Sequence, residues 1–138
     1  MGTTIRPVLS GRNQYWIDKH RYYELKHFCL QYPLWKAAYC ALDGLSKGAS
    51  FMTLSQASTP GDPTAKCAMA RLYYSDRMDM VEQAAKDTDS DLAGYLIKAV
   101  TEGISYDHLK TRFDIPCSKD AYYNLYRRFF WLLSEARE

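Results

Sequence analysis

The chain has 138 residues, of which 47% are hydrophobic, 14% are aromatic and 25% are charged, and its formal net charge is +2. This length suits one domain, or a small domain with an arm, and the apolar fraction is enough for a core that needs no disulfides. No stretch approaches the roughly 20 continuous apolar residues of a membrane span, and the N-terminus has no apolar signal core. We therefore expect a soluble, intracellular protein without membrane association.

The sequence carries no recognisable catalytic or cofactor-binding motif. It has no nucleophile elbow, phosphate-binding glycine loop, H-E-x-x-H pair or EF-hand loop. The four cysteines lie far apart without a C-x-x-C pair: Cys29, Cys40, Cys67 and Cys117. This spacing argues against a zinc site and against a disulfide framework, so we interpret the cysteines as buried thiols. We expect no enzymatic activity, no cofactor and no metal.

Residues 1–45 predict an aromatic and basic helical hairpin. Its first helix covers residues 15–32, Pro33 interrupts it, and its second helix covers residues 34–42 and ends near Gly44. Four basic side chains interleave with the aromatic ones: Lys19, Arg21, Lys26 and Lys36. This pattern is compatible with stacking on nucleic acid, but more often it is a core face beside a solvated face.

Residues 46–63 are rich in Ser, Thr, Gly and Pro and predict a linker or mobile loop. Residues 64–138 predict a helical domain that begins with a long amphipathic helix at 65–87. That helix would either mediate dimerisation or pack on the C-terminal helices. An acidic turn follows it, in which Asp89 or Ser90 would cap the next helix, at 92–101.

The last third of the chain predicts a helix-turn-helix at about residues 105–136. Gly103 is placed as a C-cap, and Ser105 as the N-cap of a short helix. Pro116 then breaks the helical pattern, because it lacks an amide donor and restricts the residue before it. Ser118 can cap a third helix that runs to about Ala136. Together these elements predict an all-α fold, a helical bundle with a C-terminal helix-turn-helix.

A helical wheel of the third helix separates an apolar arc from a polar one. The apolar arc, which predicts the core face, contains Ala121, Tyr122, Leu125, Tyr126, Phe129 and Leu132. In a helix-turn-helix, the N-terminal part of this helix enters the major groove, where Arg pairs with guanine and Asn with adenine. The residues that we expect to contact DNA are Lys119, Tyr123, Asn124, Arg127 and Arg128. The alternative is that Arg127 and Arg128 only solvate the helix.

Three segments resemble the C-terminal region of small proteins from phages and prophages of Gram-positive bacteria. They are residues 102–106 (EGISY), 114–118 (DIPCS) and 122–134 (YYNLYRRFFWLLS). The pattern is similar to the ArpU and RinA groups of late-gene transcriptional regulators, which are themselves likened to sigma-factor region 4. The resemblance covers roughly residues 90–138 and implies a regulator in the cytoplasm of a bacterial host. The turn of this chain departs from the pattern in having few basic residues.

The charge distribution keeps two classes of function open. Residues 1–47 carry 7 Lys and Arg against 3 Asp and Glu, whereas residues 105–138 carry 6 against 5. The first hypothesis is a sequence-specific regulator that binds duplex DNA, possible also as a homodimer with half-sites about one helical turn apart. The second is an interaction module or inhibitor that binds a host or phage protein, since Tyr, Trp and Arg are enriched at binding hot spots.

Overall fold

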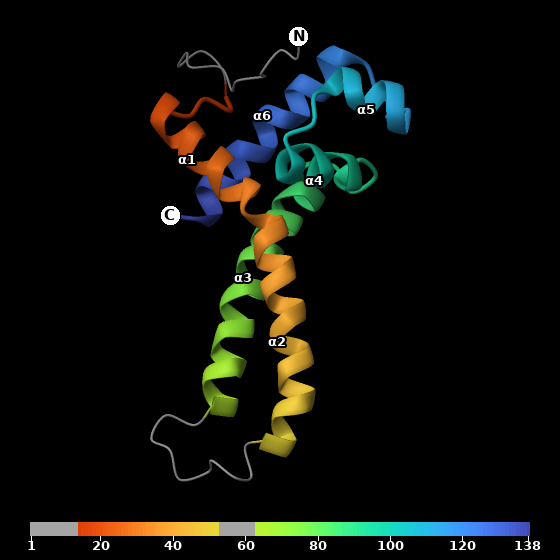
Figure 1. Ribbon diagram of the computed structural model, residues 1–138. Coiled ribbons are helices and arrows are strands. Elements are labelled where there is room, and N and C mark those ends of the chain that lie inside the picture. Colours follow the sequence, from red (N-terminus) through yellow and green to blue (C-terminus); the bar gives the residue numbers. More distant parts are fainter. Residues whose placement is uncertain (1–13, 53–62) are drawn as a thin grey trace. The chain divides into compact units, whose positions relative to one another are not determined.

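The computed structural model describes the backbone of residues 14–52 and 63–138, and the side chains of these residues except 43–52. Every regular element in this part of the chain is a helix, which confirms the all-α fold class (Figure 1). The helices are α1 (Lys19–Leu30), α2 (Tyr32–Met52), α3 (Pro63–Thr88), α4 (Ala93–Glu102), α5 (Tyr106–Phe113) and α6 (Lys119–Ala136). No helix among the described residues combines the length and the apolarity needed to cross a bilayer.

The chain divides into two compact units, and the division differs from the predicted domain boundaries at 45 and 63. The aromatic unit, as we name it, comprises Met1–Gln31 and Met80–Glu138, of which residues 14–31 and 80–138 are described. The hairpin unit comprises Tyr32–Asp79. Helix α1 packs on α4 and α6, so it belongs with the C-terminal helices. The predicted pairing of the first two helices therefore does not define a domain.

The core of the aromatic unit is built around aromatic rings from α1 and α6. Tyr22, Phe129 and Phe130 are almost completely buried. The Tyr22 and Phe130 rings meet edge to face, with centroids 5.2 Å apart, and the Tyr22 and Tyr126 hydroxyls form a hydrogen bond of 3.0 Å. This bond satisfies two buried hydroxyls that would otherwise be costly to desolvate. Burial raises the pKa of Tyr126 well above its ordinary value, so the Tyr126 hydroxyl stays protonated.

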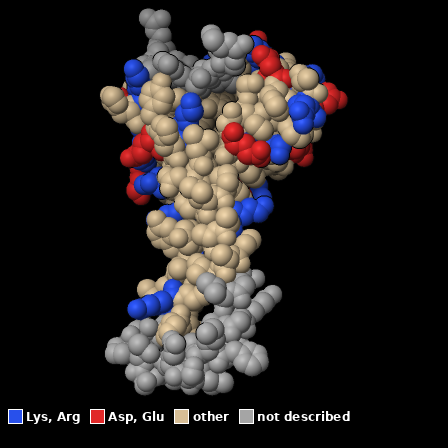
Figure 2. All heavy atoms as spheres, in the orientation of Figure 1, with Lys and Arg blue, Asp and Glu red and all other residues tan. Residues whose placement is uncertain are grey.

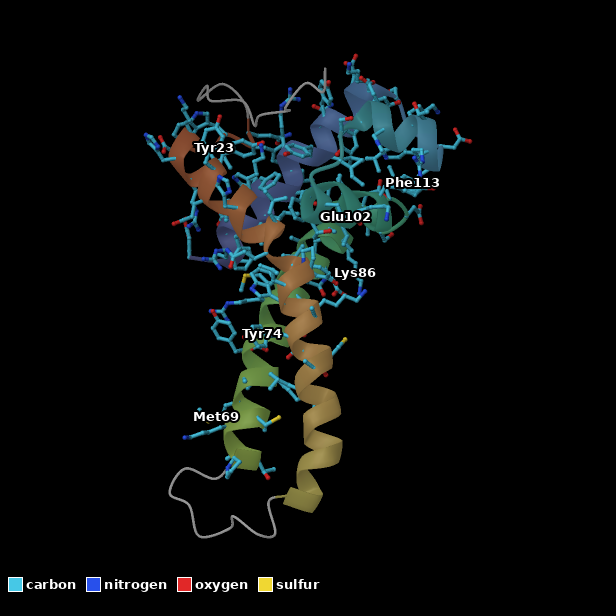
Figure 3. All side chains as sticks on the ribbon, in the orientation of Figure 1. Tyr23, Met69, Tyr74, Lys86, Glu102 and Phe113 are labelled. Carbon is cyan, nitrogen blue, oxygen red and sulfur yellow. The ribbon has the colours of Figure 1, made fainter. Side chains whose placement is uncertain are left out.

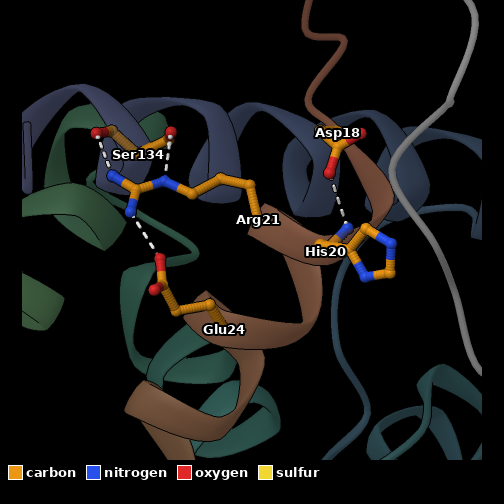
Figure 4. Close-up of polar contacts among 5 residues, drawn as sticks. All are labelled: Asp18, His20, Arg21, Glu24 and Ser134. Carbon is orange, nitrogen blue, oxygen red and sulfur yellow. Dashed lines mark hydrogen bonds and ion pairs between the residues drawn. The ribbon is translucent and has the colours of Figure 1, made fainter.

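Arg21 fastens α1 to the last turns of α6 (Figure 4). Its Nε donates to Oγ of Ser134 and its Nη2 donates to the Ser134 carbonyl oxygen, both at 3.0 Å. Its Nη1 forms an ion pair of 2.5 Å with Glu24. The guanidinium therefore saturates a carbonyl near the C-terminus of α6, where helical carbonyls lack partners. Arg21 is one of the four basic residues that interleave with the aromatic ones and could stack on nucleic acid. In the structure its guanidinium instead contacts Ser134 and Glu24.

The predicted caps at Gly103, Ser105 and Ser118 are confirmed, whereas the predicted cap of α4 by Asp89 or Ser90 is wrong, since the N-cap is Leu92 without a side-chain hydrogen bond. Ser105 and Ser118 have extended backbones, and their hydroxyls accept from the amides of His108 and Ala121. Gly103 ends α4 with φ of 70°, a left-handed conformation that glycine adopts without steric cost. The first helix starts later than predicted, at Lys19, because the Asp18 carboxylate accepts from the amide two residues on.

The hairpin unit consists of α2 and the first part of α3. Cys67 Sγ donates to the Leu42 carbonyl oxygen at 3.5 Å, and Arg71 Nη2 donates to the Tyr39 hydroxyl at 3.1 Å. Residue numbers rise on one helix as they fall on the other, so the two helices run antiparallel. The second helix does not end near Gly44 as predicted but continues to Met52, since a single glycine inside a helix costs only about 1 kcal/mol.

Two further predictions, the linker and the burial of the cysteines, can now be compared with the structure. The predicted linker at 46–63 is wrong over residues 46–52, which are helical, and its residues 53–62 lie outside the described part of the chain. The four cysteines do not share one environment: Cys29 is buried in the aromatic unit, whereas Cys40 is exposed on α2. The prediction of four buried thiols is therefore confirmed for Cys29 and wrong for Cys40, while Cys67 and Cys117 are half-buried.

Candidate nucleic-acid interface

The first half of α6 presents a polar face to solvent, close to where the wheel placed it. The buried residues of this helix are Tyr122, Tyr126, Phe129, Phe130, Leu133 and Ser134. Ala121, predicted for the core, is exposed, and Leu125 and Leu132 are half-buried. The core face is thus rotated by about one residue from the prediction: Phe130 and Leu133 are buried, and the Phe130 ring packs on Tyr22 of α1.

The turn between α5 and α6 is held from both sides. Ile115 is fully buried, and its amide donates to the Leu109 carbonyl oxygen at 3.4 Å. The Tyr106 hydroxyl donates to the Cys117 carbonyl oxygen at 2.7 Å, and Lys110 Nζ donates to the Ile115 carbonyl oxygen at 3.3 Å. These contacts fix the start of α6 relative to α5, which is the requirement for a helix that presents side chains in a defined direction.

Asp114 sets the exit from α5 with a left-handed backbone, φ of 49°. Asp and Asn adopt this conformation more readily than other residues that have a side chain. Lys110 Nζ lies 3.5 Å from the Asp114 carboxylate, so the same lysine contacts both the carboxylate and the backbone of the turn. Sequence analysis missed the positioning roles of Tyr106 and Lys110, although their spacing from the turn is visible in the sequence.

Lys119 and Tyr123 lie one turn apart at the start of α6. Lys119 Nζ is 5.8 Å from the centroid of the Tyr123 ring. A hydrogen bond with Tyr123 and the nearby Asp107 carboxylate raise the pKa of Lys119, which keeps the ammonium charged. Lys119 is exposed and Tyr123 is half-buried, so the pair places a cation over an aromatic ring.

Asn124 and Arg127 interact with each other on the next turn of the same face. Arg127 Nη1 donates to Oδ1 of Asn124 at 3.2 Å. Asn124 is exposed, while Arg127 is half-buried and its Nε is buried without a hydrogen-bond partner among the described residues. The bond orients the amide and the guanidinium together, and both retain donors for another ligand.

Arg128 is separated from the other four predicted residues. Its Nη2 donates to the Asp87 carbonyl oxygen at 3.2 Å, one residue before the end of α3. Arg128 thereby caps a helix C-terminus, where a cation and a donor are both favourable. The structure brings Lys119, Tyr123, Asn124 and Arg127 together, and it gives Arg128 a contact within the fold.

Acidic side chains are interspersed with the basic ones around this face. Asp107 and Asp120 are exposed in the first turns of α5 and α6, and Asp114 is exposed in the turn between them. On the face that Figure 2 shows, Lys and Arg atoms are interspersed with Asp and Glu atoms. Any phosphate contact here would depend on a few individual basic side chains and little on the electrostatic potential of the surface as a whole.

Two further side chains border the region. Arg112, which the sequence analysis did not single out, is exposed in the last turn of α5. Phe113, beside it, has Lys98 Nζ at 4.8 Å from its ring centroid, and Lys98 also pairs with Glu102 at 3.1 Å; Figure 3 labels Phe113 and Glu102. These contacts join the C-terminal ends of α4 and α5.

Trp131, in the second half of α6, lies outside the set of residues that this helix buries. Its ring centroid is 5.9 Å from that of Tyr15, which precedes α1. The side chain is half-buried, so the segment before α1 covers part of it. Among the described residues, no group of three or more His, Cys, Asp or Glu side chains is arranged to hold a metal ion.

Comparison with protein-family models, with curated proteins and with solved structures gives no match.

Proposed function

We propose that the exposed face at the start of α6 binds duplex DNA and that the protein is a sequence-specific transcriptional regulator of a phage or prophage. The observation that carries the proposal is the grouping of Lys119, Tyr123, Asn124 and Arg127 on one solvent face, directly after a short helix and a fixed turn. The resemblance of residues 90–138 to late-gene regulators supports the same function.

Each of these side chains has chemistry suited to a role on DNA. Asn124 can pair bidentately with adenine, and Arg127 with guanine, in the major groove. Lys119, at the N-terminus of the helix, is suited to a phosphate, where the free amides of the first turn also favour an anion. Tyr123 can add a hydroxyl contact to the backbone.

The second candidate is a protein-interaction module with the same polar face. The observation that favours it is the set of exposed carboxylates around the face, Asp107, Asp114 and Asp120, which repel phosphate. A protein partner with its own basic groups would tolerate these carboxylates, and Tyr123 with Arg127 would supply hot-spot residue types.

Fluorescence anisotropy with a duplex pool of mixed sequence separates the two candidates. Affinity should fall steeply with salt, and Lys119→Ala should reduce the slope of log affinity against log salt by about 1. The control is Lys36→Ala, which removes one exposed cation from α2 and should leave the slope unchanged.

The double variant Asn124→Ala/Arg127→Ala tests base reading. Both residues are replaced because each hydrogen-bonds the other, and a single change would leave the second group free to adapt. On a preferred duplex the loss should be about 1 to 3 kcal/mol per base-reading side chain. If wild-type protein with a native circular dichroism spectrum binds no duplex at low salt, the DNA proposal is wrong and a protein partner becomes the better hypothesis.

A further inference from the structure

An apolar stripe on α3 is left exposed in the hairpin unit. Met69, Leu72 and Tyr73 expose 70%, 59% and 49% of their surfaces, and Figure 3 labels Met69 on this helix. At about 100° per residue, the three lie on the side of α3 opposite Cys67 and Arg71, which contact α2. The stripe therefore faces away from α2. Such a helix face is normally covered by another surface.

Arg77 and Tyr74 hold the Tyr73 ring in a defined position. The Arg77 guanidinium carbon lies 3.3 Å from the centroid of the Tyr73 ring, and Arg77 Nη1 donates to the Tyr73 carbonyl oxygen at 3.1 Å. The Tyr74 ring meets the Tyr73 ring edge-on at 5.2 Å. Because the ring is already oriented, little side-chain entropy would be lost when a partner covers it.

Charges of opposite sign stand at the two ends of the stripe. Lys66 is exposed at its N-terminal end, and Asp76 and Asp79 are exposed at its C-terminal end, where Arg77, placed on the Tyr73 ring, leaves a net charge of −1. A second α3 laid antiparallel on the first would bring each lysine to the partner's aspartates. A parallel second helix would place like charges together. The stripe is thus complementary to itself when turned end for end, which is the property of a two-fold interface.

We propose that a second copy of this chain packs on this stripe, antiparallel, about a two-fold axis between Leu72 and Tyr73. In this register Leu72 meets the partner's Tyr73, and Lys66 lies opposite the partner's Asp79. Met69 enters the space between the partner's Tyr73 and the partner's Asp76. The interface is a homodimer contact through α3, separate from the polar face of α6 and independent of the proposed DNA binding.

Sedimentation velocity of the full chain without DNA, over a series of protein concentrations, tests this proposal. Wild-type protein should dimerise, and Leu72→Glu should raise the dissociation constant at least about 10-fold, because each substitution counts twice in a two-fold interface. Lys86→Asp is the control: it places a new carboxylate on an exposed position of α3 outside the stripe and should leave the constant unchanged. Circular dichroism of every variant establishes that the helices are retained.

A charge exchange tests the antiparallel register. Lys66→Asp and Asp79→Lys should each raise the dissociation constant about threefold to tenfold. The double variant Lys66→Asp/Asp79→Lys should associate more tightly than either single variant, since the opposite charges face each other again. A wild-type protein that is monomeric at every concentration overturns the proposal. It is equally overturned by a dimer that Leu72→Glu leaves intact, or by a double variant no tighter than the singles.

Discussion

The aromatic unit buries its large apolar side chains, whereas the hairpin unit leaves several of them exposed. In the aromatic unit Tyr22, Phe129 and Phe130 are at most 1% exposed, whereas Leu72 and Tyr73 of the hairpin unit are about half exposed. Helix α1 packs on both α4 and α6, so these helices bury more than one face. In the hairpin unit, α3 contacts α2 through Cys67 and Arg71, and Leu72 and Tyr73 lie on the opposite side of α3. The two units therefore offer different surfaces: a polar face on α6, proposed to bind DNA, and an apolar stripe on α3, proposed to bind a second copy of the chain.

The largest expected effect is that of emptying the core of the aromatic unit. Phe130→Ala removes a buried ring that contacts Tyr22, Tyr126 and Phe129, and should lower the free energy of unfolding by about 3 to 5 kcal/mol. The matched change in the hairpin unit, Leu72→Ala, should cost no more than about 0.5 kcal/mol in the monomer, because this side chain is 59% exposed. Urea denaturation at low protein concentration measures both, and equal losses would contradict the comparison.

Alkaline pH should act on the aromatic unit next. Burial raises the pKa of Cys29, Tyr122 and Tyr126, so the folded protein keeps protons that the unfolded chain releases above about pH 9 to 10. The stability that these groups contribute is complete at lower pH and is lost as the pH rises, since the unfolded state then binds fewer protons.

Cys29→Ala sharpens this prediction. The ordinary pKa is 9.0 for a thiol and 10.0 for tyrosine, so the onset of destabilisation should move upward in the variant, by less than one pH unit because burial raises the pKa of Cys117 as well. Urea denaturation between about pH 7 and pH 11 gives the onset for both proteins. An identical onset in the two would show that the buried thiol does not contribute.

The anchor between α1 and α6 should give an intermediate effect. Arg21→Ala removes two hydrogen bonds to Ser134 from a guanidinium that is 28% exposed, and should cost about 1.5 to 3 kcal/mol. Glu24→Gln removes only the ion pair with a carboxylate that is 58% exposed, and should cost at most about 1 kcal/mol. The two values come from the same denaturation experiment, and a larger loss for Glu24→Gln would contradict the assigned role of Arg21.

The loss of a helix cap at the start of α6 should have a smaller effect than the loss of Arg21. Ser118→Ala leaves the Ala121 amide without its acceptor and should cost about 1 kcal/mol, while Ser118→Asp should retain the cap. Thermal unfolding followed by circular dichroism detects the difference. If alanine and aspartate behaved alike, the hydroxyl would not be acting as a cap.

The helices and caps of the C-terminal third could be predicted because their causes are local. The hydroxyls of Ser105 and Ser118 accept hydrogen bonds from amides three residues on, and Gly103 adopts a left-handed backbone without steric cost. Each of these patterns is contained in a few consecutive residues. The end of α2 was missed because the glycine taken as its stop is tolerated within a longer helix.

Tertiary partners could not be predicted in the same way. The core face of α6 is rotated from the wheel because α1, which is about 100 residues away in the sequence, packs against it. Arg128 was grouped with the candidate DNA contacts by its position on α6, yet it donates to a carbonyl of α3. Hydrophobic periodicity indicates on which face of a helix a side chain lies, but it does not identify the group that the side chain contacts.

Selection of duplexes from a random-sequence DNA library tests the central claim, that the exposed face of α6 reads DNA, most directly. It is run at near-physiological salt with wild-type protein beside Asn124→Ala/Arg127→Ala, with circular dichroism of both as the folding control. We predict that wild-type protein enriches one motif and that the variant loses preference at defined positions of that motif. No enrichment by folded wild-type protein, or the same motif from both proteins, would contradict the claim.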